Sequence, residues 1–134
     1  MQLNDLPKDW VYYFASPYTS PCDYIRELRY LDVIKVATDL IRQDFTLIEP
    51  IAMSHQHAQR FGLPGTYTFW QKRDRKFIDL CDAVMVCLLD GWDQSVGVTD
   101  EISYAKSQEK PVYYLSPPDL RLVSEEEALS YALH

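Results

Sequence analysis

Two apolar runs constrain the fold of this chain more than any other feature. Residues 83–89 are apolar without interruption, and residues 10–15 form a similar apolar and aromatic run. Such runs are typical of strands covered on both faces, as in a parallel sheet between two helical layers. Two further strands are predicted at 45–48 and 111–115.

Helical patterns alternate with these strands. We predict a long helix with Ser20 as N-cap and Pro21 as its first residue. Its apolar stripe repeats every three or four residues and consists of Ile25, Leu28, Leu31, Ile34, Ala37 and Ile41. Further helices are predicted at 66–80 and 97–108, and a capping box of Ser124 and Glu127 opens a short last helix. The segment 51–64 has no clean period and is expected to be an irregular or partly helical flap.

This alternation predicts one α/β domain over residues 1–134, a three-layer flavodoxin- or Rossmann-like parallel sheet of strand order 2-1-3-4. In such a sheet, ligands bind beyond the carboxyl ends of the strands where the order reverses. The loops 16–21 and 90–95 are therefore expected to face the binding site.

Composition narrows the function classes. The net charge is -7 and no Lys or Arg run is present, so duplex nucleic acid is not an expected partner. No segment has the roughly 18 apolar residues of a membrane span, and no basic leader precedes an apolar stretch, so we expect a cytoplasmic protein. Three cysteines without CxxC spacing are expected to be buried thiols rather than a disulfide framework or zinc site: Cys22, Cys81 and Cys87.

Glu101 is the first candidate for chemistry, because it falls in about the first turn of the helix after the run 83–89. An acidic residue is also ordinary there, since the helix dipole favours it. A catalytic carboxylate needs a second group that tunes it or acts as an acid. Tyr13 and Asp74 are candidates, although their spacing alone does not bring them together.

Three motifs carry a resemblance to a known family. They are 13–17 (Tyr-Phe-Ala-Ser-Pro), Asp74 with Cys81 and Asp82, and 95–105 with Gly97 four residues before Glu101. Over about 12–115 the chain resembles the nucleoside 2-deoxyribosyltransferase superfamily. It looks most like a subgroup of unassigned function that is frequent in phage-related genomes, and it is also similar to 2'-deoxynucleoside 5'-monophosphate N-glycosidases.

The resemblance implies a double displacement at the anomeric carbon. Glu101 would attack that carbon, the base would leave, and water or another base would resolve the glycosyl ester. Tyr13 would orient Glu101, and Asp74 would contact the base and assist proton transfer. Asp82 is expected to cap a strand instead. No cofactor is implied, and a homo-oligomer is expected by analogy.

Ser95 bears on the substrate. At the position six residues before the nucleophile, the resemblance implies an aspartate in transferases that act on free nucleosides and a serine in the monophosphate glycosidases. This chain has Ser95 at that position. A hydroxyl beside a helix N-terminus donates to a phosphate that a carboxylate would repel. A simple N-cap role fits the same position, and Asp93 could supply the transferase-type carboxylate if the loop shifts register.

Other residues are predicted as substrate contacts. The loop 16–21 offers the hydroxyl of Ser16, and the helix after it carries Arg26 and Arg29, for which surface ion pairs are expected. Trp92 is a candidate stacking surface for the base, whereas Trp70 is expected to pack in the core. The spacing of His55 and His57 could suggest a metal site, but the sequence shows no third ligand. His55 is therefore predicted to contact the substrate from the flap.

The leading hypothesis is an N-glycosidase that hydrolyses a (deoxy)nucleoside 5'-monophosphate through a glycosyl-Glu101 intermediate. One alternative is base exchange between deoxynucleosides by a nucleoside 2-deoxyribosyltransferase. The other is a non-catalytic module that binds a nucleotide or an ADP-ribose-like ligand.

Overall fold

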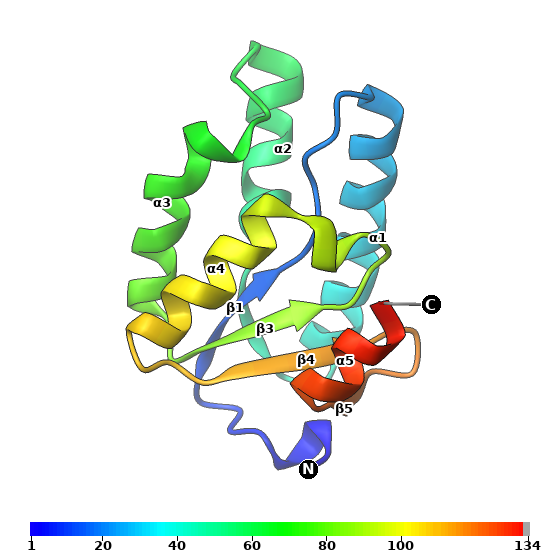
Figure 1. Ribbon diagram of the computed structural model, residues 1–134, viewed down its shortest axis with the longest axis vertical. Helices are drawn as coiled ribbons and strands as arrows, with labels where there is room; N and C mark the ends of the chain where they lie inside the picture. Colours follow the sequence, from blue (N-terminus) through cyan, green and yellow to red (C-terminus); the bar gives the residue numbers. More distant parts are fainter. Residues whose placement is uncertain (133–134) are drawn as a thin grey trace.

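A five-stranded sheet of order β2-β1-β3-β4-β5 forms the centre of the computed structural model, which describes residues 1–132 (Figure 1). The first four strands pair in parallel, and the fifth is antiparallel to its neighbour. The strands are β1 (Val11–Ala15), β2 (Thr46–Ile48), β3 (Ala83–Cys87), β4 (Val112–Ser116) and β5 (Arg121–Val123). The predicted α/β class and the order 2-1-3-4 are confirmed. The sequence analysis missed β5, because three residues are too few to show an alternating pattern.

Helices cover both faces of the sheet, which gives three layers (Figure 1). They are α1 (Asp23–Arg42), α2 (Pro50–Phe61), α3 (Tyr67–Leu80), α4 (Val96–Ser107) and α5 (Glu125–Ala132), with short 3-10 turns at Leu3–Asp5 and Trp92–Gln94. Alternate residues of β3 serve the two layers: Met85 packs with the α1 side, and Val84 and Val86 pack with the side of α3, α4 and α5. Burial on both faces explains the unbroken apolar run of this strand.

The predicted core stripe of α1 is wrong. The helix instead buries Val33, Val36, Ala37 and Leu40, all but Ala37 outside that stripe. Four stripe residues are exposed, namely Ile25, Leu28, Leu31 and Ile41. A helix of 20 residues is about 30 Å long, whereas a strand of five residues spans about 17 Å. The first half of α1 therefore projects past the strand ends, where it has no sheet to cover (Figure 1).

The start of α1 also differs from the prediction. The helix begins at Asp23 with Cys22 as N-cap, two residues after the predicted first position Pro21. Ser20 accepts a hydrogen bond from the Cys22 amide at 3.2 Å, so it closes a turn before the helix. Cys22 is exposed, which corrects its expected burial, while Cys81 and Cys87 are buried as predicted.

The expected flap is a regular helix over most of its length. Pro50 is the first residue of α2, where its missing N–H costs no helical hydrogen bond. The helix ends at Gly62, whose φ of 70° is a left-handed conformation that favours glycine. Its period was hidden because its buried face contains His55, a residue that an apolar pattern does not count.

Two predicted caps are found in altered form. The Val11 amide donates to Asp82 Oδ2 at 2.8 Å, so this aspartate caps the start of β1 and not that of β3, which it precedes in the sequence. The Glu127 amide donates to Ser124 Oγ at 3.0 Å, which is the N-cap half of the predicted capping box at the start of α5. Within residues 1–132, none of the helices has the length and apolar character that crossing a membrane requires.

Candidate active site

Glu101 is buried beyond the carboxyl ends of β1 and β3, the neighbouring strands where the sheet order reverses. Because α4 begins at Val96, Glu101 is in the second turn of the helix, one turn later than predicted. The helix dipole acts mainly within the first turn. Only 5% of Glu101 is exposed, so its position is not that of an ordinary surface acid at a helix start.

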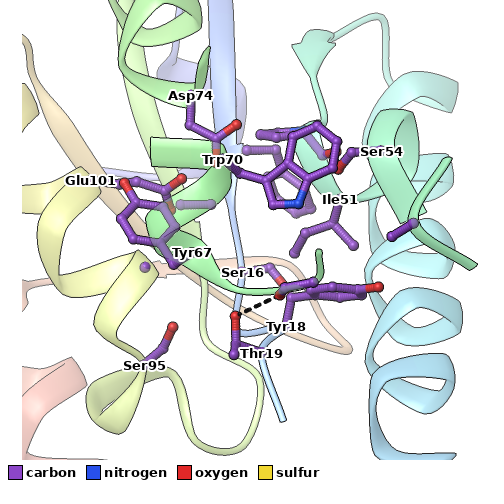
Figure 2. Close-up of a pocket in the computed structure, with 16 residues that line it drawn as sticks. Ser16, Tyr18, Thr19, Ile51, Ser54, Tyr67, Trp70, Asp74, Ser95 and Glu101 are labelled. Atoms are coloured by element: carbon purple, nitrogen blue, oxygen red, sulfur yellow. Dashed lines mark hydrogen bonds between the residues drawn. The ribbon is translucent and has the colours of Figure 1, made fainter. Parts of the chain in front are cut away.

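The predicted partners of Glu101 converge on it. Tyr13, at the middle of β1, is fully buried, and its hydroxyl donates a short hydrogen bond to Glu101 Oε2. Asp74 of α3 is also buried and faces the same cavity as Glu101 (Figure 2). Residues 13, 74 and 101 are thus brought together by a central strand and two helices.

Burial controls the protonation of the two carboxyl groups. It raises the pKa of Asp74 to about 7, against the lowering effects of a Tyr13 hydrogen bond and the Arg73 charge. Burial and the neighbouring Asp74 raise the pKa of Glu101 well above its usual range. The Tyr13 hydroxyl lowers the pKa of both carboxyl groups, so it opposes the effect of burial at each of them. Because Asp74 also raises the pKa of Glu101, the two groups titrate as a coupled pair.

The cavity around these groups is formed by four segments: the loop after β1, α2, the start of α3 and the start of α4. The cavity is open to solvent, and its wall combines apolar side chains with hydroxyl and carboxyl groups. Figure 2 shows Asp74 and Glu101 at one end of the cavity and Ser95 and Thr19 at the other. A ligand bound here would contact carboxyl groups at one end and hydroxyl groups at the other.

The wall of the cavity includes Ser95 and Ser16, both predicted as substrate contacts, and Gly97 of the 95–105 motif. Ser95 is the N-cap of α4, and its Oγ accepts from the Val98 amide at 3.2 Å, which leaves its own proton free to be donated. Ser16 is 6% exposed, and its Oγ has no hydrogen-bond partner among residues 1–132. Buried hydroxyls are rarely left unpaired, so this atom marks a place where a ligand or water would bind.

Tyr67 is a cavity residue that the sequence analysis missed. Its hydroxyl donates to Asp100 Oδ2 at 2.8 Å, and Arg75 binds both oxygens of Asp100 at 2.6 and 3.2 Å. These hydrogen bonds hold the pKa of Asp100 below its usual value against the opposing effect of burial. A Cβ at Gly97 would lie 3.0 Å from the Tyr67 ring, so glycine permits this close approach. No sequence pattern links residues on two helices in this way.

The predictions for Trp70 and Trp92 are both wrong. Trp70 lines the cavity, and its Nε1 donates to the Pro64 carbonyl at 2.6 Å. Trp92 is buried against Tyr114, with ring centroids 5.9 Å apart, and is not part of the cavity wall. Asp93 also lies outside the wall, where it accepts from the Gln94 side chain at 3.1 Å. The structure thus offers Trp70, not Trp92, as a stacking surface for a ligand.

His55 lies behind the cavity wall. It is 1% exposed, with Nδ1 2.6 Å from the Tyr18 hydroxyl and Nε2 2.8 Å from Glu27 Oε2. The Tyr30 ring stacks on it at 4.1 Å. Since Tyr18 itself lines the cavity, His55 supports a wall residue instead of facing the ligand directly.

Two arginines near the start of α1 hold the loop after β1. Arg26 donates to the Ser20 carbonyl and forms the expected surface ion pair, with Asp23. Arg29 donates to the Thr19 carbonyl at 2.8 Å instead of forming the expected ion pair, which is not found among residues 1–132. Among residues 1–132, no three His, Cys, Asp or Glu side chains are grouped so that they could hold a metal ion.

Comparison with known proteins identifies the family of this chain. Residues 11–116 match the model of a domain of unknown function, DUF1937. The chain belongs to the DUF1937 family. The match runs from the start of β1 to the end of β4, so the DUF1937 domain includes every residue of the cavity wall. No curated protein matches the chain.

Proposed function

We propose that this DUF1937 protein is an N-glycosidase that hydrolyses the base–sugar bond of a (deoxy)nucleoside 5'-monophosphate. The observation that carries the proposal is the convergence of Tyr13, Asp74 and Glu101 in one buried cavity. Two buried carboxyl groups beside one cavity, of which our proposal takes Glu101 as ionised and Asp74 as protonated, are what glycosyl transfer through a covalent intermediate needs. The resemblance to the nucleoside 2-deoxyribosyltransferase superfamily supports the same residues in the same roles.

In the first step, ionised Glu101 attacks the anomeric carbon of the sugar. The bond from this carbon to the base nitrogen breaks, its electron pair passes to the base, and Asp74 donates the proton that the departing base needs. Tyr13 holds the attacking oxygen in place through its hydrogen bond. The products are free base and a glycosyl ester of Glu101.

In the second step, water attacks the anomeric carbon of the ester. The Asp74 carboxylate, which lost its proton in the first step, accepts a proton from this water. The bond from the anomeric carbon to Glu101 breaks, and its electron pair returns to the carboxylate. Both groups are then back in their starting protonation states, and the sugar phosphate leaves.

The hydroxyl end of the cavity supports a monophosphate as substrate. Ser95 has a free proton to donate, Ser16 Oγ is unpaired in the described chain, and Gly97 lies in the first turn of α4, at the positive end of the helix dipole. Asp93, the carboxylate that would favour a free nucleoside, is not part of the wall. With the phosphate at this end, the sugar would lie near Glu101 and the base near Asp74 and Trp70 (Figure 2).

The test is a set of deoxy- and ribonucleoside monophosphates and free nucleosides, incubated with and without a second base, with free base measured by chromatography. We expect release from a monophosphate without an acceptor. Release only with an acceptor would favour base exchange. Binding without cleavage would favour a nucleotide-binding module.

The nucleophile is tested with Glu101→Gln, which keeps the size of the side chain and an oxygen that accepts from Tyr13. We expect cleavage to fall at least about a thousandfold, since removal of a nucleophile leaves little activity. Asp93→Asn, a carboxylate change outside the wall, is the matched control and should keep wild-type cleavage. A sugar adduct on the wild-type protein, found by intact mass and absent from Glu101→Gln, would identify the ester. Undiminished turnover by Glu101→Gln would exclude the mechanism.

A further inference from the structure

A second hollow lies between α2 and α3, directly beside the candidate active site. The two hollows share four wall residues: Pro50, Ser54, Trp70 and Asp74. In Figure 2 Trp70 lies beside Asp74, at the end of the cavity away from Ser95. A base held near Asp74 would therefore have this second hollow next to it.

The remaining wall of this hollow has a mixed character. Met53, Leu63 and Phe77 supply apolar surface, although Met53 is 50% exposed and Leu63 is 41% exposed, and His57 and Arg73 supply polar groups. Apolar side chains gathered along an open groove are typical of surfaces that bind a ligand. Here they would cover the hydrocarbon part of a group that extends from the base.

Arg73 brings a positive charge to the same groove. Its guanidinium lies over the Trp70 ring, with Cζ 5.7 Å from the ring centroid. None of the ion pairs found among residues 1–132 includes Arg73. An unpaired guanidinium is a strong site for a carboxylate, which it binds with two parallel hydrogen bonds.

We propose that the groove between α2 and α3 is a leaving-group subsite, which accepts a base whose substituent is a short chain ending in a carboxylate. The chain would pack on Met53 and Leu63, and the carboxylate would pair with Arg73. This inference rests on the proposed function for its placement of the base near Asp74. It adds that the substrate is a nucleotide with an enlarged, acidic base.

The test uses dAMP and dCMP whose exocyclic amino group carries a carboxyethyl, a propyl or an aminoethyl chain. Affinities are measured by calorimetry on Glu101→Gln, so that turnover does not interfere, and cleavage is measured separately on wild type. We expect the carboxyethyl compounds to bind roughly tenfold more tightly than the propyl compounds, and the aminoethyl compounds to bind most weakly.

Arg73→Gln, made in the same Glu101→Gln background, should abolish the preference for the carboxyethyl over the propyl chain. The preference is expressed relative to the affinity of the same variant for unsubstituted nucleotides, because Arg73 also lies over Trp70 and lowers the pKa of Asp74. Lys76→Gln removes the same charge from α3 at an exposed position outside the groove wall, so it should keep the preference.

Several results would overturn the subsite. Equal affinities for the three chains would do so, as would a carboxylate preference that survives Arg73→Gln. A loss of affinity in Arg73→Gln for dAMP but not for deoxyadenosine would place the phosphate at Arg73 and contradict both the subsite and the orientation proposed above. Cleavage of unsubstituted nucleotides without any gain from the carboxylate overturns the subsite alone. A carboxylate preference in binding without any cleavage supports the subsite and contradicts the glycosidase.

Discussion

The two sides of the cavity are held in place by different means. The carboxylate side, formed by Tyr13, Asp74 and Glu101, is anchored on β1, α3 and α4, and its side chains are almost completely buried. The α2 side, formed by Pro50, Ile51, Ser54 and Ala58, belongs to a helix that rests on α1 through the polar cluster around His55. The reacting groups are therefore held by β1 and by two helices that pack on the sheet. The shape of the base site depends instead on a few side-chain contacts between α1 and α2.

Asp74→Asn tests the carboxylate side and has the largest expected effect in this comparison. It removes the proton donor, so the rate of base release should fall roughly 10²- to 10⁴-fold. Because Asp74 must be protonated in the first step, wild-type activity should decline as pH rises through its pKa of about 7. The residual activity of Asp74→Asn should lack this decline, as pH–rate profiles of both proteins would show.

Asp79→Asn is the matched control for this prediction. Asp79 lies on the same helix, is exposed, and accepts from the Tyr104 hydroxyl at 2.6 Å, away from the cavity wall. It should keep both the rate and the pH profile of wild type. If Asp74→Asn retained the decline above pH 7, the proton donor would have to be another group.

The carboxylate side of the cavity could be predicted from the sequence, whereas the contacts between helices could not. Glu101 was a candidate because it follows a strand-like run in a predicted parallel sheet, whereas Tyr13 and Asp74 were joined to it by the resemblance of short motifs to a known family. Tyr67 depends on hydrogen bonds between α3 and α4, and His55 depends on contacts between α1 and α2. Contacts of this kind leave no period in the sequence, because each one joins residues far apart in the chain.

The error in α1 has a related cause. A hydrophobic period shows that a helix has an apolar face, but it does not show how much of the helix reaches the sheet. Each step of three residues also turns the side-chain direction by about 60°, so the predicted stripe winds around the helix. Leu28 and Leu31 therefore point away from the face that buries Val33 and Leu40.

His55→Ala tests the α2 side. It removes two hydrogen bonds and the stacking contact with Tyr30, and it leaves a gap between α1 and α2. We expect the free energy of unfolding to fall by about 2–3 kcal/mol, as for other buried polar side chains in networks. Urea unfolding measures this loss. Activity should show a higher KM with a smaller change in kcat, since Tyr18 would lose its support.

His57→Ala is the control on the same helix. His57 is exposed, so its removal should change the free energy of unfolding by less than about 0.5 kcal/mol. Equal stability losses from the two substitutions would show that α2 is held by its backbone and apolar contacts. A fall in kcat without a change in KM for His55→Ala would show that the two sides of the cavity are not independent.

The smallest predicted effect is that of Glu101→Gln on the free energy of unfolding, which is separate from its effect on cleavage. Since burial raises the pKa of Glu101 in the folded protein, the ionised carboxylate destabilises the fold, and this penalty grows as pH rises above the unfolded-state pKa. The variant should therefore be more stable than wild type by about 1–2 kcal/mol at pH 8. The gain should shrink towards pH 5, where the unfolded carboxyl group also binds protons. Urea unfolding at both pH values measures the difference, with Asp93→Asn as the control for removal of a carboxylate outside the cavity wall. A Glu101→Gln protein that is less stable than wild type at both pH values would show that the Tyr13–Glu101 hydrogen bond contributes more to the fold than burial of the charge removes.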